Sequence, residues 1–246
     1  MEAAHDAQGG TTTGGRSSRG LLIAGGVCAI LWPVLSLVYY AAYPIAAGGA
    51  MVLEPGVEGG LATRAAALGQ RPAIVALEWI YALLPLLLWP FFASLYRLLG
   101  GRGQRDLALV AIGVGLLGIG LMTLSYTFNP TILHALGQAY VGAGSEAEGA
   151  AILNTLDGLI RWMRGLNQAS SLLYLGCEAL LSLALLRSRT WRAWGWVGLV
   201  GALLALPAKL PLGLQVPTNI IWTGLAYVVW PVALGVGLLR SKKMAE

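Results

Sequence analysis

The sequence predicts an all-α membrane protein, built as a bundle of six transmembrane helices. The chain of 246 residues is 57% hydrophobic and only 11% charged, whereas roughly 25% of the residues in soluble domains are charged. The apolar residues are gathered in six long stretches, and the density of arginines alternates from one intervening segment to the next. A water-exposed surface needs more charge than this chain supplies, but a surface in contact with lipid does not.

The six apolar stretches have the length of membrane-spanning helices. Each contains about 19–25 residues, which at ~1.5 Å per residue is enough to cross a hydrocarbon core of ~30 Å. The stretches are Gly20–Tyr43, Pro72–Tyr96, Leu107–Phe128, Asn167–Leu186, Trp194–Leu212 and Asn219–Leu239. They predict a membrane domain over residues 20–240, followed by a short tail at residues 241–246.

The first stretch follows a polar tail, residues 1–19, in which Gly, Thr and Ser are prominent. This composition predicts disorder. The apolar run behind the tail is longer than the about 7–15 residues of a signal-peptide core. We therefore expect the first stretch to remain in the mature protein as an anchor.

Prolines and glycines punctuate the later stretches. Prolines are tolerated inside membrane helices because neighbouring groups satisfy the carbonyls that they leave free, and we expect kinks near Pro85 and Pro207. Small residues let helix backbones approach one another in lipid. The third stretch has four glycines that predict such contacts: Gly113, Gly115, Gly118 and Gly120.

Two segments between the apolar stretches are long enough to form structure of their own. Pro44–Arg71 is rich in Gly and Ala and is expected to be a loop. Asn129–Leu166 is expected to contain an amphipathic helix, because Ser145 and Glu148 have the spacing of a helix-capping box. Its apolar residues recur at helical spacing: Ile152, Leu156, Leu159, Ile160 and Met163. This helix is expected either to lie on the outer membrane face or to pack as a cap over the bundle.

The basic residues predict the orientation in the membrane. Eleven lie on one side of the predicted bundle: Arg16, Arg19, Arg97, Arg102, Arg105, Arg187, Arg189, Arg192, Arg240, Lys242 and Lys243. Five lie on the other: Arg64, Arg71, Arg161, Arg164 and Lys209. Because basic residues favour the cytoplasmic side of short loops, both termini are predicted to be cytoplasmic. The expected location is the inner (plasma) membrane of a bacterium.

One helical face in the fourth stretch carries polar residues at membrane depth. Five residues share this face at helical spacing: Asn167, Ser171, Tyr174, Glu178 and Ser182. A carboxylate at the bilayer centre costs about 2.5–3.5 kcal/mol on insertion scales, so Glu178 should face the bundle interior. The face predicts either a site for a proton or cation, or a structural carboxyl group that is hydrogen-bonded to neighbouring helices.

A second polar feature is a candidate ion pair between Glu78 and Lys209. With the predicted topology, both residues lie at a similar depth near the outer ends of their helices. The alternative is that each side chain extends separately to the membrane interface.

Chemistry-bearing motifs are otherwise missing from the sequence, so no catalytic residue, metal site or cofactor is predicted. His134 has no second ligand at metal-binding spacing, and Cys28 and Cys177 are expected to be buried thiols. No nucleophile motif or phosphate-binding loop occurs in a suitable context. The basic residues form no cluster of the kind found on nucleic-acid-binding surfaces.

Three segments resemble the bacterial six-helix membrane proteins grouped as domain of unknown function 4386. They are RGLLIAGGVCAIL at residues 19–31, LLRSRTWRAWGWVGLVGALL at 185–204 and IIWTGLAYVVWPVALGVGLL at 220–239. The resemblance covers about Arg19 to Arg240. It implies a six-helix bundle and no known activity, so it supplies no functional residues.

The sequence favours a non-enzymatic membrane protein, either an accessory subunit or a sensor-like partner of another membrane protein. The alternative function is a small proton- or cation-coupled transporter that uses Glu178. The bilayer is the first expected partner in both cases.

Overall fold

The computed structural model describes residues 13–46, 60–99, 102–209 and 224–240, and these form helices without any strand. Four helices are long and apolar enough to cross a membrane: Arg19–Tyr43, Pro72–Leu98, Gly103–Val141 and Glu146–Leu186. Two shorter apolar helices cover Arg192–Pro207 and Leu225–Arg240. The all-α class of the described chain is therefore confirmed, whereas six spans remain a prediction.

Helix α1 (Thr13–Ala46) starts before the predicted Gly20. Residues 13–19 of the expected disordered tail are therefore helical, and the rest of that tail lies outside the described residues, as does the tail at 241–246.

Helix α2 (Gly60–Gln70) corrects the expectation of a loop over Pro44–Arg71. Its sequence, GLATRAAALGQ, is rich in alanine, the residue with the highest helix propensity. The second apolar stretch follows as α3 (Pro72–Leu83), a 3₁₀ turn η1 (Leu84–Leu87) and α4 (Leu88–Leu98). The α-helix is interrupted at Pro85 by this turn, because proline cannot supply the N–H of a regular helical bond.

The third apolar stretch continues beyond its predicted end at Phe128. Helix α5 (Arg102–Thr127) leads through a π-helical turn η2 (Asn129–Leu133) into α6 (His134–Val141). The turn absorbs Pro130, and within it the Leu133 N–H donates to the Phe128 carbonyl at 2.9 Å. A widened turn of this kind lets a helix continue past a proline.

Helix α7 (Glu146–Leu186) spans 41 residues and corrects the second loop prediction. The expected amphipathic helix and the fourth apolar stretch form one continuous helix. Ser145 caps it as predicted, since the Glu148 N–H donates to the Ser145 Oγ at 3.2 Å. The apolar face of its first half does not lie on lipid. Leu156, Ile160 and Met163 are buried in a cluster with residues of α2 and η2.

The chain ends in two shorter helices. Helix α8 (Arg192–Lys209) follows α7 after a short link at residues 187–191, and a π-helical turn η3 (Leu225–Val229) leads into α10 (Trp230–Arg240). Residues 210–223 lie between them and outside the described residues, and so do the predicted boundaries at Leu212 and Asn219.

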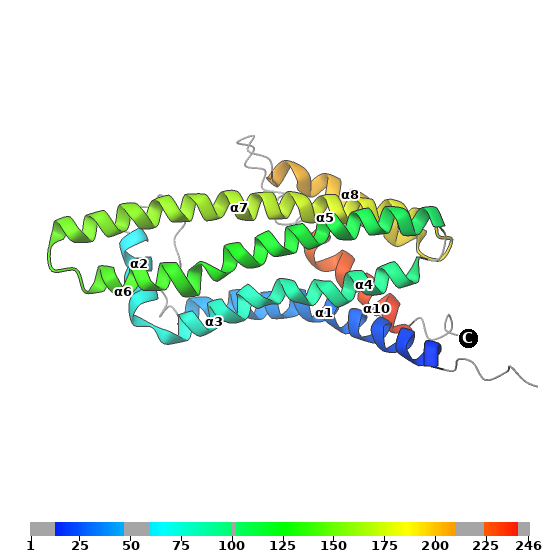
Figure 1. Cartoon of the computed structure of the whole chain (residues 1–246), viewed down its shortest axis with the longest axis horizontal. Helices are drawn as coiled ribbons and strands as arrows, with labels where there is room; N and C mark the ends of the chain where they lie inside the picture. Colours follow the sequence, from blue (N-terminus) through cyan, green and yellow to red (C-terminus); the bar gives the residue numbers. More distant parts are fainter. Residues whose placement is uncertain (1–12, 47–59, 100–101, 210–223, 241–246) are drawn as a thin grey trace, which may run out of the picture.

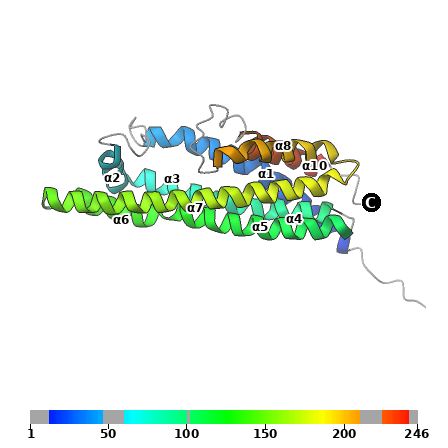
Figure 2. The same cartoon turned by 90° about the horizontal axis from the view of Figure 1, so that it is seen from above.

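The long helices lie side by side along one axis (Figures 1 and 2), with α8 and α10 near one end of the molecule and α2 near the other. We call these the α8 end and the α2 end. Helix α7 runs the whole length, and at ~1.5 Å per residue it is about 60 Å long, twice the ~30 Å hydrocarbon core. Its α2 half carries the exposed Arg161 and Arg164. If the protein spans a bilayer, we expect this charged half to be the part that extends beyond it.

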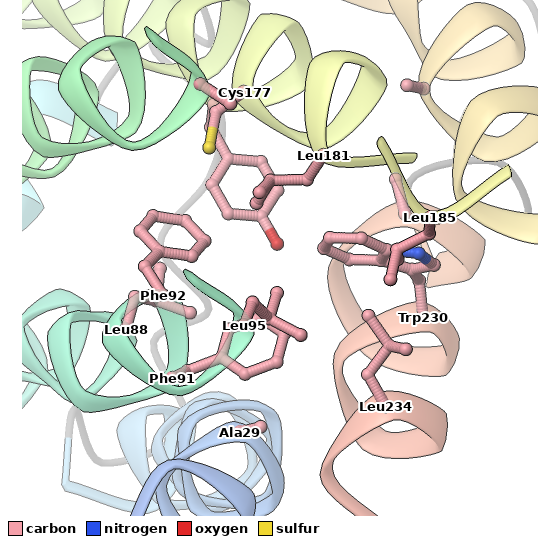
Figure 3. Packing of buried hydrophobic residues seen from close by; sticks show 14 of the residues in the cluster. Ala29, Leu88, Phe91, Phe92, Leu95, Cys177, Leu181, Leu185, Trp230 and Leu234 are labelled. Carbon is pink, nitrogen blue, oxygen red and sulfur yellow. The ribbon is translucent and has the colours of Figure 1, made fainter. Parts of the chain in front are cut away.

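Two apolar clusters hold the helices together. The smaller one joins α2, α3, η2 and α7 at the α2 end. In the larger one, aromatic and leucine side chains of α4, α7 and α10 converge (Figure 3), including Phe92, Leu181 and Trp230. Helix α5 approaches α7 closely at Gly115, where a Cβ atom would lie 2.6 Å from the Cys177 Sγ and 2.7 Å from the Phe92 ring.

Candidate functional site

The predicted polar face of α7 does point into the bundle. The side chains of Ser171, Tyr174, Glu178 and Ser182 are at most 5% exposed, and Asn167 is half-buried. The structure divides this face into two parts. Asn167 and Ser171 line a cavity, whereas the other three residues lie deeper along α7 and do not line it.

The cavity has a volume of about 210 Å³, and its described lining residues come from α1, α3, η1, α5, α7, α8 and η3. Its walls combine aromatic, apolar and a few polar groups. The lining residues are Trp32, Pro33, Ser36, Tyr40, Tyr81, Leu84, Pro85, Met122, Tyr126, Asn167, Ser171, Lys209 and Tyr227. A concave, mainly apolar site with a few converging polar groups is typical of small-molecule binding.

Lys209 supplies the charge of the cavity wall. Its Nζ lies 5.7 Å from the centre of the Tyr227 ring, within the range of a cation–π contact. The backbone of Lys209 is fixed against α7, because the Gln168 Nε2 donates to its carbonyl at 2.7 Å. Within the described part of the chain, the ammonium group forms no ion pair with a carboxylate.

Three tyrosine hydroxyls form another part of the wall. The Tyr40 and Tyr81 hydroxyls lie 2.8 Å apart, and the Tyr81 hydroxyl donates to that of Tyr126 at 3.5 Å. These residues come from α1, α3 and α5 and were not predicted as site residues. Their spacing within each helix gives no sign of the contact, because it depends on how three separate helices pack.

An aromatic triad closes the cavity toward the α8 end. The rings of Tyr174 and Tyr227 stack with centres 4.6 Å apart, and Trp32 packs on them at 5.7 Å and 6.0 Å, respectively. Trp32 and Tyr227 line the cavity, whereas Tyr174 lies behind them. Glu178 follows Tyr174 by one helical turn, so the triad lies between the cavity and this carboxyl group.

Glu178 is enclosed without a hydrogen-bonding partner. It is 1% exposed, and neither carboxyl oxygen has a partner among the described residues. The Tyr174 hydroxyl and the Ser182 Oγ are buried and unpartnered in the same way. The described residues therefore show no contact of the structural alternative, a carboxyl group that is hydrogen-bonded to neighbouring helices.

The predicted ion pair between Glu78 and Lys209 is not formed in the described residues. The Glu78 carboxylate accepts a hydrogen bond from the Asn129 Nδ2 at 2.9 Å, and the side chains of Tyr39 and Tyr43 lie nearby. Its cationic neighbour is Arg64. The prediction failed because it considered depth alone. Glu78 contacts Asn129, whereas the Lys209 ammonium lies over the Tyr227 ring.

Arg64 completes this second polar cluster, since its Nη2 donates to the Asn129 Oδ1 at 3.5 Å. The cluster thus joins α1, α2, α3 and η2 around a buried carboxylate. A buried carboxylate with several donors is a structural arrangement. The sequence analysis missed Arg64 because it expected a loop where α2 lies.

The remaining candidates have structural explanations. The His134 Nδ1 forms a hydrogen bond with the Leu68 carbonyl and joins α6 to α2. Cys177 is buried and Cys28 is half-buried, and both are free thiols. Among the described residues, no three His, Cys, Asp or Glu side chains are grouped to hold a metal ion.

Comparisons of the chain with protein-family models, with curated proteins and with solved structures find no match.

Proposed function

We propose that the protein is a non-enzymatic, sensor-like membrane protein that binds a small molecule in the cavity between its helices. The observation that supports this proposal is the Lys209 ammonium in the wall of a largely aromatic cavity, where it has no ion-pair partner among the described residues. Removing a cation from water is costly unless another group compensates it. A ligand that supplies this compensation would bind selectively, and its binding could then be passed to a partner protein.

The arrangement of the cavity suits a sensor because several helices contribute to it. A ligand would contact α1, α3, α5, α7 and α8 at once, and its differential affinity for two helix arrangements would shift their populations. The α2 end, which extends beyond the bilayer, provides a surface outside the membrane for a partner. This is the accessory role predicted from the sequence, with the ligand site added.

Filling the cavity tests the binding proposal. Full-length protein in lipid nanodiscs would be screened against a library of small metabolites by the shift of its thermal unfolding midpoint. Ser36 lines the cavity, and its hydroxyl donates to the carbonyl four residues earlier at 2.8 Å. Ser36→Phe should abolish every stabilising shift, because the ring occupies the ligand volume.

Thr155→Phe is the matched control. Thr155 also donates to the carbonyl four residues earlier, at 3.0 Å, but it is exposed on α7 at the α2 end. This variant should keep the shifts of the wild type. A ligand that stabilises both variants equally binds elsewhere, and the proposal then fails.

A second candidate function is a proton-coupled carrier, and Glu178 behind the aromatic triad favours it, because its carboxyl oxygens have no hydrogen-bond partner in the described segments. In this case Tyr174 and Tyr227 would separate the cavity from the Glu178 carboxyl group, which would exchange a proton. Proteoliposomes loaded with a pH-sensitive dye provide the test, with an imposed membrane potential to drive proton entry. Proton uptake that disappears in Glu178→Gln and persists in Glu78→Gln supports the carrier; absence of uptake in the wild type rejects it.

A further inference from the structure

We infer that the cavity binds a small organic anion with a planar apolar body, of the aromatic carboxylate class, and that Lys209 is its anion contact. This inference rests on the proposed function, because it names the ligand class of the same cavity. Three properties of the described residues lead to it: the cavity volume, the sign of the charge in its wall, and the polar groups that have no partner.

The volume limits the ligand to about one ring. A cavity of about 150 Å³ in another protein accommodates a single benzene molecule. The present cavity is larger, at about 210 Å³, which leaves room for one six-membered ring and one or two small substituents. Lipid tails and dinucleotides are too large to fit within it.

The sign of the charge decides between a cation and an anion. Aromatic walls alone are typical of sites for organic cations, and here Trp32, Tyr81 and Tyr227 provide such walls. However, Lys209 is a cation itself, and no carboxylate is among the described lining residues. Repulsion between like charges is strong in a site of low dielectric constant. An anion therefore fits the cavity, with its ring against the aromatic side chains and its charge at the Lys209 ammonium.

The unpartnered polar atoms indicate a second substituent. The Asn167 Oδ1 is buried and has no hydrogen-bond partner among the described residues. Asn167 and Lys209 both line this cavity, so one ligand can meet the amide and the ammonium. A hydroxyl or amine on the ligand would donate to this oxygen, because an unpaired buried acceptor carries a desolvation cost that a donor removes.

A binding measurement with one matched pair of compounds tests the inference. We would titrate 4-hydroxybenzoate, and its neutral analogue 4-hydroxybenzyl alcohol, into full-length protein in nanodiscs and subtract the signal of empty nanodiscs. The anion should bind at least 10-fold more tightly than the alcohol. Lys209→Met should remove this preference, whereas Lys209→Arg should keep the anion affinity within about threefold, because it retains the charge.

Two controls make the outcome decisive. Arg164→Met removes an exposed cation at the α2 end and should leave the anion affinity unchanged. The unfolding midpoint of ligand-free Lys209→Met shows whether the variant is folded; if it is not, Lys209→Gln replaces it. Equal affinity for the two compounds in the wild type, or an unchanged anion preference in a folded Lys209 variant, overturns the inference.

The failure of this inference and that of the proposed function are distinguishable. If neutral compounds bind and Ser36→Phe blocks them, the cavity is a ligand site but the anion inference is wrong. If neither these compounds nor the library of small metabolites binds the wild type, both proposals fail together.

Discussion

At the scale of single residues, two buried glutamates are in opposite situations. Glu78 and Glu178 are each 1% exposed. Glu78 accepts a hydrogen bond from Asn129 and lies near the side chains of Tyr39 and Tyr43, whereas neither oxygen of Glu178 has a partner in the described part of the chain. The sequence marked both positions as polar groups in an apolar stretch. It could not show which one has partners, because the partners come from other helices.

This difference predicts opposite effects on stability. Replacing Glu178 by Leu removes an unsatisfied buried group and should raise the free energy of unfolding by about 1–2 kcal/mol. Glu78→Leu leaves the donors around it unpaired and should lower it by about 2–4 kcal/mol. Denaturant unfolding in mixed micelles, followed by tryptophan fluorescence, measures both. Equal destabilisation by the two variants would mean that Glu178 has partners after all.

At the scale of helices, the positions of the apolar stretches were predictable from hydropathy, but their junctions were not. Hydropathy places the start of the fourth stretch at Asn167, because exposed charged residues such as Arg161 and Arg164 precede it. The backbone of α7 continues as a helix to Glu146, because nothing between these positions terminates it. Hydropathy shows where the polarity of the side chains changes along α7. It does not show where the helix begins.

The continuity of α7 predicts the effect of alanine at Gly165. This glycine lies near the predicted junction, and a Cβ atom there would meet nothing within 4 Å. In a continuous helix, Gly165→Ala should stabilise the protein by about 0.5–1 kcal/mol. Gly158→Ala, which is equally open and inside the same helix, is the matched control and should give a similar gain. Destabilisation by Gly165→Ala alone would indicate a turn at this position.

Glycine contacts between helices were predicted as a group, but the structure separates them. Gly115 and Gly118 pack against α7, whereas Cβ atoms at Gly113 and Gly120 would meet nothing within 4 Å. Sequence spacing alone does not show which face of α5 meets α7.

This separation gives a matched pair of substitutions. Gly115→Ala should cost about 1–3 kcal/mol of stability, because the added methyl group would overlap Cys177 and the Phe92 ring. Gly113→Ala should be neutral or slightly stabilising. Thermal unfolding of the two variants compares them directly, and equal midpoints would contradict the close approach of α5 and α7 at Gly115.

At the scale of the whole molecule, the helices Gly103–Val141 and Glu146–Leu186 are much longer than the about 20 residues that a bilayer requires, and both reach the α2 end. The α2 end has its own apolar cluster, formed by residues such as Leu68, Leu133 and Leu156, so it is a packed extension of the bundle. The helical spacing of Leu156, Ile160 and Met163 indicates one side of this cluster, but the sequence does not show their partners in α2 and η2, because those residues lie in segments that read as loops. The predicted orientation places this extension outside the cytoplasmic membrane.

Cysteine labelling tests the extension and the orientation together. In a background with Cys28→Ser and Cys177→Ala, single cysteines at Thr155, Leu183 and Ser188 would be treated in intact cells with a membrane-impermeant maleimide. Thr155 is exposed at the α2 end. It lies about 30 Å along α7 from Leu175 in the larger apolar cluster, at ~1.5 Å per residue. Thr155→Cys should therefore react. Leu183 is 40% exposed on the same helix, yet Leu183→Cys should resist the reagent because that surface faces lipid.

Ser188 in the link between α7 and α8 distinguishes the two membrane sides. Ser188→Cys should react only after the cells are opened, because the arginine-rich links are predicted to be cytoplasmic. If Ser188→Cys but not Thr155→Cys is labelled in intact cells, the predicted orientation is wrong and must be reversed, whereas the extension at the α2 end stands. Labelling of Leu183→Cys would contradict the membrane assignment itself. That assignment rests on the low charge of the chain and on the length of its apolar helices, and it requires lipid to cover this surface of α7.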